Sequence, residues 1–183
     1  MLELSKLLKI IKFISFFMIF LSLQSCSVED KKLLFEDLKK PETLVQYIKN
    51  GVSEENRKLA QSLYDGGLKK GRPKRASSWG APVKYFTESA LLYPSAKTLV
   101  SLSEAESFFI SDADDKFRLE TLSTIKKYLI SAIAVDEIQK ELSKDEVAKV
   151  KNDIACIGDF LKSKIKKDDC IYVATTLNTL KKD

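Results

Sequence analysis

Apolar residues recur at helical spacing in almost every segment of the chain, and this periodicity restricts the fold more than any other feature. Steps of three and four residues place side chains on one face of an α-helix, whereas a half-buried strand would need strict alternation. Only six glycines are available for turns in 183 residues. The pattern predicts an all-α fold. The most regular apolar stripes are Val83, Phe86, Ala90 and Tyr93; Leu99, Leu102, Ala105 and Phe109; Leu122, Ile125, Leu129 and Ala132; and Val147, Val150, Ile154, Ile157 and Leu161.

Residues typical of helix ends predict two further helices ahead of these stripes, between Pro41 and Gly67. Pro41 opens a short helix that Asn50-Gly51 closes, as proline suits the first helical position and glycine the position after the last. Ser53 is expected to begin the next, because its hydroxyl can accept from a backbone N–H of the first turn. We expect that helix to bury Leu59 and Leu63 and to end at Gly66-Gly67.

The last segment of the sequence is ambiguous. Cys170 to Leu180 is rich in β-branched residues, which favour strands, but a lone strand would have no sheet to join. We therefore predict a helix there.

Two segments of the chain are similar to each other at an offset of 42 residues. Tyr85–Pro94 can be laid over Lys127–Asp136, and a period of this size is typical of stacked helical pairs that complete one another's core. The alignment places Phe86 on Tyr128, Ser89 on Ser131 and Ala90 on Ala132.

The first copy resembles the second helix of a tetratricopeptide repeat. The spacing Phe86-x-x-Ser89-x-x-x-x-Pro94 matches an aromatic residue, a small residue that lets helices approach, and a proline that closes the repeat. The resemblance implies antiparallel helical hairpins stacked as a short solenoid, with Phe86, Ser89, Pro94, Tyr128 and Ser131 as packing residues. It covers about half of the chain beyond residue 25. The period is longer than the 34 residues usual in the family, and an irregular helical bundle would give the same stripes.

The amino-terminal segment has the composition of an export signal. Lys6, Lys9 and Lys12 precede an uncharged, strongly apolar run from Phe13 to Val28. This run is shorter than the roughly 18 to 20 apolar residues that a membrane-spanning helix needs. Export is the prediction, and an uncleaved membrane anchor is the alternative.

Leu23-Gln24-Ser25-Cys26 resembles the lipobox of bacterial lipoproteins. The resemblance implies cleavage before Cys26 and acylation of its thiol, and multiple acyl chains anchor a protein without a spanning helix. We therefore expect a signal peptide over residues 1–25, a lipidated tether over 26–40 and a helical domain over 41–183. Ser27 stands where an Asp would retain many lipoproteins at the inner membrane, so the analogy favours the outer membrane.

The residue inventory gives no support to an enzymatic or cofactor-dependent function. There is no histidine, which excludes Ser-His and Cys-His nucleophiles and the usual zinc ligand sets. Gly66–Arg72 lacks the spacing of a phosphate-binding loop. Asp112 and Asp114 begin like a calcium loop, but Lys116 and Phe117 break the pattern. We expect no enzyme, cofactor, metal or small-molecule substrate, and the mild net charge of +5 argues against nucleic acid.

Cys156 and Cys170 remain once Cys26 is assigned to lipid. Two cysteines outside the cytosol permit a disulfide between the last stripe and the terminal segment. The alternative is a pair of buried thiols that fill core space.

The segment Lys69–Arg75 carries a dense positive charge. Such a loop would attract anionic lipid headgroups or an acidic surface of a partner, although a solvated flexible loop explains it equally well. Its cations are Lys69, Lys70, Arg72, Lys74 and Arg75.

Taken together, these features predict a lipid-anchored envelope adaptor that binds another envelope protein or peptide, of unknown identity, through a helical-repeat surface. A surface-displayed lipoprotein that binds a host or environmental ligand is the alternative, because a lipid anchor permits both.

Overall fold

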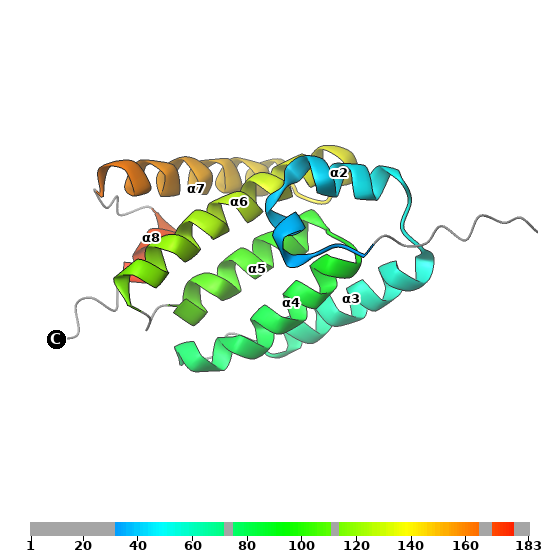
Figure 1. Cartoon of the computed structure of the whole chain (residues 1–183), viewed down its shortest axis with the longest axis horizontal. Coiled ribbons are helices and arrows are strands. Elements are labelled where there is room, and N and C mark those ends of the chain that lie inside the picture. The colour runs from blue at the N-terminus through cyan, green and yellow to red at the C-terminus, as the bar shows by residue number, and fades with distance from the viewer. Residues whose placement is uncertain (1–31, 72–74, 111–113, 165–169, 178–183) are drawn as a thin grey trace, which may run out of the picture. The chain divides into compact units, whose positions relative to one another are not determined.

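The described part of the chain is entirely helical apart from its turns, which confirms the all-α prediction. The computed structural model describes residues 32–71, 75–110, 114–164 and 170–177. No strand occurs among these residues (Figure 1). The elements in chain order are η1 (Phe35–Lys39), α2 (Pro41–Lys49), α3 (Glu54–Lys69), η2 (Ala76–Trp79), α4 (Gly80–Leu92), α5 (Ala96–Phe109), α6 (Asp115–Gln139), α7 (Lys144–Ser163) and α8 (Ile171–Leu177).

The long helices from α3 to α7 each pack against the next one in the chain, as antiparallel hairpins do (Figure 1). The element η1 packs against α4 and α6, and α2 packs against α6. The terminal helix α8 lies against α5 and α7.

Two apolar clusters hold these helices together. The larger one joins η1, α2, α4, α5 and α6 around Leu38, Leu99 and Tyr128, all fully buried. The smaller one joins α6, α7 and α8 around Leu129 and Ile157. The stripe Leu122, Ile125, Leu129 and Ala132 is fully buried, as its spacing predicts, because α6 is covered on several sides.

Helix α3 corrects two of the expectations from sequence. Gly66-Gly67 does not end the helix, which continues to Lys69. A Cβ atom on Gly67 would lie 2.5 Å from Cε1 of Phe86, so glycine is required there for the close approach of α3 and α4. The buried stripe was also assigned to the wrong face: Leu59 is 49% exposed, whereas Ala60 is buried. Leu63 is only half-buried.

The stripe on α5 is correct except at its end. Leu99, Leu102 and Ala105 are fully buried, but Phe109 is 42% exposed. Its neighbour Phe108 instead stacks on Trp79, with ring centroids 4.6 Å apart.

The packed region begins earlier than the expected boundary at Pro41. Leu33 and Leu38 are buried in the larger cluster, although both fall in the segment expected to be a tether. The short helix η1 buries Leu38, whereas Leu34, immediately before the helix, is 68% exposed. Leu33 and Leu38 therefore belong to the domain and not to a linker.

Helix ends follow the expected capping chemistry. The Ser53 side chain accepts from the N–H of Asn56, which starts α3, and Asn50 caps the end of α2. The Asp114 carboxylate accepts from the N–H of Phe117 at 2.9 Å, so this acid caps α6 as expected for the acidic turn. The segment after Cys170 is helical over Ile171–Leu177.

The expected signal peptide, the Cys26 attachment site and the first part of the tether lie outside the described residues. In the part of the chain that the structure describes, no helix combines the length and apolar character needed to cross a membrane.

Candidate functional site

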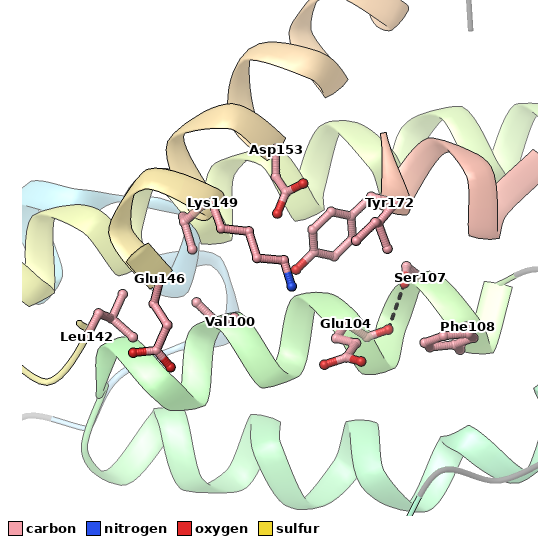
Figure 2. Close-up of a pocket in the computed structure, with 11 residues that line it drawn as sticks. Val100, Glu104, Ser107, Phe108, Leu142, Glu146, Lys149, Asp153 and Tyr172 are labelled. Atoms are coloured by element: carbon pink, nitrogen blue, oxygen red, sulfur yellow. Dashed lines mark hydrogen bonds between the residues drawn. The ribbon is translucent and has the colours of Figure 1, made fainter. Parts of the chain in front are cut away.

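A cavity with a volume of about 310 Å³ opens between α5, α7 and α8 (Figure 2). Three chain segments far apart in sequence supply its walls. The residues that line it are Val100, Glu104, Ser107, Phe108, Leu142, Glu146, Lys149, Val150, Asp153, Ile171 and Tyr172.

The wall from α5 has apolar residues at its two ends, Val100 and Phe108, and polar residues between them, Glu104 and Ser107. Val100, Glu104 and Ser107 are separated by four and three residues, so they share one face of the helix. The Ser107 hydroxyl donates to the backbone carbonyl of Glu104 at 2.7 Å and thus satisfies its own polarity within the helix.

The wall from α7 is fixed by how that helix begins. Ser143 and Glu146 form a capping box, in which the Ser143 N–H donates to the Glu146 carboxylate at 2.7 Å. These hydrogen bonds hold the pKa of Glu146 below its usual value. The turn before α7 is held by Asp136, whose carboxylate accepts from the N–H of Leu142 at 2.8 Å. Lys149 and Asp153 then lie one turn apart on the side that faces the cavity.

The wall from α8 is attached to α7 by a covalent bond. Cys156 and Cys170 are joined in the structure, with Cα atoms 5.8 Å apart. This bond lies immediately before Ile171 and Tyr172, so it brings both residues to the cavity. The Tyr172 side chain is buried, and burial together with the charges of Asp153 and Glu104 raises its pKa. The hydroxyl therefore stays protonated and can act as a hydrogen-bond donor.

Asp153 is the most unusual member of the site. The residue is only 5% exposed, although it lines the cavity. Burial raises the pKa of Asp153, and the Lys149 ammonium offsets part of this effect. Burial has this effect because it disfavours the charged form of a carboxyl group.

Two smaller cavities are lined by residues of α3, α4 and α5. One, of about 220 Å³, is lined by Leu68, Trp79, Ser101 and Glu104 among others, so Glu104 borders this cavity and the first. The other, of about 130 Å³, is lined by Arg57, Tyr93 and Glu141 among others. Residues of α5 line all three cavities, with α7 or α3 on the other side, and we refer to the three cavities together as the α3/α5/α7 groove.

A second buried acid lies away from this groove, beneath η1. Glu106 on α5 is 8% exposed, and burial raises its pKa to about 7, although the Lys39 charge and the Tyr128 hydroxyl act in the opposite direction. Tyr128 is fully buried, and its hydroxyl lies beside Glu106 without a hydrogen bond of ordinary geometry to a described residue. The ring of Phe35 packs edge-on to Tyr128 at 6.2 Å.

The predicted packing residues are all buried, in two related positions. Phe86 on α4 contacts Tyr64 on α3, and Tyr128 on α6 lies beside Glu106 on α5. The two pairs have the same separation along the chain, so the sequence offset has a counterpart in the packing. The Ser89 hydroxyl donates to the Ala60 carbonyl at 2.8 Å, which joins α4 to α3. Pro94 is buried between α4 and α5, and Ser131 is buried on α6.

The predicted basic surface is only partly described. Lys69 and Lys70 are exposed at the end of α3, and Arg75 is exposed before η2. The Lys70 ammonium lies 5.7 Å from the centre of the Tyr85 ring. Arg72 and Lys74 lie outside the described residues. None of these cations lines the α3/α5/α7 groove as its described residues define it.

Sequence reasoning missed Asp153, Lys149, Glu104 and Tyr172 as a group. A signal for part of the group exists, since Glu146, Lys149 and Asp153 recur at steps of three and four beside the apolar stripe of α7. Nothing in the sequence connects this polar edge with Glu104 or Tyr172, because the fold alone brings them together.

The side chains of the site are those of a binding pocket with both polar and apolar walls. Among the described residues, no group of three or more acidic, cysteine or histidine side chains is placed to hold a metal ion. The site offers instead carboxylates, an ammonium, a phenol and apolar walls, which together suit a ligand with both a charge and an apolar part.

Comparison with known proteins gives no relative from which a role can be transferred. No family model, no curated protein and no solved structure matches this chain.

Proposed function

We propose that this chain is a lipid-anchored adaptor of the bacterial cell envelope, which binds an extended segment of another envelope protein in the α3/α5/α7 groove. The observation that carries the proposal is that α5 residues line all three cavities. We propose that successive side chains of one polypeptide segment occupy them. A single enclosed pocket would favour a small molecule instead.

One feature of the sequence and one of the packing support the lipid anchor and the repeat-like architecture. The resemblance of Leu23-Gln24-Ser25-Cys26 to a lipobox supports the anchor and an envelope location, with the outer membrane favoured. The equivalent Phe86–Tyr64 and Tyr128–Glu106 pairs support a repeated hairpin architecture similar to that of tetratricopeptide proteins, whose inner surfaces bind peptides.

Position-specific photo-crosslinking in intact cells tests the adaptor function. A photoreactive residue at Glu104 probes the groove, and the same residue at Glu137, an exposed acid on α6, is the matched control. We expect one envelope protein to crosslink from Glu104 and not from Glu137, with the crosslink mapping to one short segment of that protein. Equal crosslinking from both positions would contradict the proposal.

The lipid anchor needs its own test. Labelling with a palmitate analogue should modify the wild-type chain and fail after Cys26→Ala, and the crosslink from Glu104 should weaken in that variant because the effective concentration at the membrane is lost. Surface protease sensitivity of intact cells, without an envelope crosslink, would favour the displayed lipoprotein instead.

A further inference from the structure

The side chains that line the cavity between α5, α7 and α8 are more often acidic than basic. Three carboxylates line it, from Glu104, Glu146 and Asp153, against the single cation of Lys149. A bound cationic group would therefore find a complementary potential, whereas an anionic group would be repelled.

Asp153 identifies where such a cation would be placed. The residue as a whole is buried and lines the cavity, with the Lys149 ammonium as the nearest charge that acts on its carboxylate. Figure 2 shows Asp153 directed from α7 toward the Tyr172 ring, on the side of the cavity away from Glu104. A cationic N–H donor that approached from the cavity could form a charge-assisted hydrogen bond with this carboxylate.

The other walls match an aliphatic stem. Val100, Val150 and Ile171 give the cavity an apolar lining beside its charged end. Lysine and arginine side chains have this division, with methylene groups that pack on apolar surface and a charged head that seeks polar partners. At about 310 Å³ the cavity lies at the lower end of the range of roughly 300 to 1,000 Å³ for ligand pockets, which suits one side chain and not a folded surface.

We infer that this cavity binds the basic side chain of a lysine or arginine in the partner segment, with the cationic head on Asp153 and the stem against Val100 and Val150. The inference rests on the proposed adaptor function for the source of the side chain. It adds a requirement that the groove alone does not impose, namely a basic residue at one position of the bound segment.

Binding of capped amino acids to the full-length chain in detergent tests the inference directly. The probes are N-acetyl-arginine methylamide, N-acetyl-lysine methylamide and, as an uncharged control of similar length, N-acetyl-norleucine methylamide. We expect the two basic probes to bind about tenfold more tightly than norleucine, and to shift the amide resonances of α7 and α8 in NMR spectra. Equal affinity for norleucine would overturn the inference.

Variants locate the binding. Asp153→Asn keeps the size of the side chain and should weaken the basic probes about tenfold, whereas Asp145→Asn, on the exposed side of α7, should leave them unchanged. If Asp153→Asn fails to fold, Glu104→Gln provides the same test from α5, with a smaller loss expected. Unchanged affinity in the folded variants would overturn the assignment.

The adaptor function and this inference fail in different ways. If the basic probes bind but no envelope protein crosslinks from Glu104, the adaptor function is wrong and the cationic site stands, with a source other than a partner protein. If an envelope protein crosslinks from Glu104 equally well in wild type and Asp153→Asn, and the probes do not bind, the adaptor function stands and the inference is wrong.

Discussion

Gly67 shows how a single missing side chain sets the distance between two helices. The ring of Phe86 occupies the space in which a Cβ atom of residue 67 would lie, so the backbone of α3 lies directly against this ring of α4. Gly66 is less crowded, since its Cβ would lie 3.0 Å from Cε1 of the half-buried Tyr85.

We predict that Gly67→Ala destabilises the protein while Gly66→Ala does not. Alanine should favour the helix by about 1 kcal/mol at either position, but overpacking against Phe86 costs about 1 to 3 kcal/mol. Urea unfolding of both variants should give a lower free energy of unfolding for Gly67→Ala and an unchanged or higher one for Gly66→Ala. Equal stability of the two variants would contradict the packing role of Gly67.

Glu106 should make stability depend on pH in an unusual direction. Burial raises its pKa from the usual 4.5 to about 7, so the folded protein binds more protons than the unfolded chain between these values. Stability from this group is therefore greatest below pH 4.5 and falls as pH rises toward and through 7, by on the order of 3 kcal/mol in total. Lys39 and Tyr128 are the charged and titratable groups that face it.

The expected measurement is a comparison of wild type with Glu106→Gln. The difference in the free energy of unfolding between the two should shift in favour of the glutamine variant as pH is raised from 5 to 8. Parallel pH profiles would show that Glu106 is not buried as a carboxylic acid in solution.

Among the elements, α8 depends most on a single bond. It is a helix of seven residues, and Cys170 immediately before it is bonded to Cys156 of α7. Replacing both cysteines by serine should lower the free energy of unfolding by about 3 kcal/mol, the value expected for a loop of this length. Hydrogen exchange should show loss of protection mainly in α8, since α7 retains its contacts with α6.

The free-thiol alternative predicts a different outcome. A thiol alkylator applied to the unreduced, denatured protein should leave Cys156 and Cys170 unmodified if they are bonded. Modification of both, together with unchanged stability of the double serine variant, would contradict the disulfide.

The elements were predictable where a helix is covered on several sides and poorly predictable where it is not. Leu122, Ile125 and Leu129 are all buried because α6 lies within the fold, so any apolar residue on its stripe finds a neighbour. On α3 the contact face is made by small residues, while Leu59 points away from the core. Hydrophobicity alone therefore selected the wrong face of α3.

The candidate site was beyond sequence analysis for a related reason. Asp153 lies at the polar edge of α7, where an acid is ordinary, and only the arrival of α5 and α8 makes its position unusual. A role that depends on three separate segments leaves no pattern in any one of them.

At the scale of the whole molecule, the amino-terminal boundary of the domain is the feature that most needs testing. Leu38 is fully buried in the core formed by α2, α4, α5 and α6, whereas Leu34 is 68% exposed four residues earlier. We predict that Leu38→Ala costs about 2 to 5 kcal/mol of stability and that Leu34→Ala costs less than about 0.5 kcal/mol. Thermal unfolding of both variants distinguishes a packed η1 from a tether, for which the two losses would be similar and small.

The position of η1 also determines how the domain would carry a mechanical load. Leu33 is buried in the larger apolar cluster, and η1 packs on α4 and α6, with Lys39 near the buried Glu106 of α5. Tension applied from an anchor ahead of Leu33 would act first on the apolar contacts of Leu33 and Leu38 in the larger cluster. The helices that line the cavities would feel this force through those contacts. We expect η1 to detach from the core under such tension before α3, α5 and α7 move. A segment bound between those helices would then remain bound while η1 detaches.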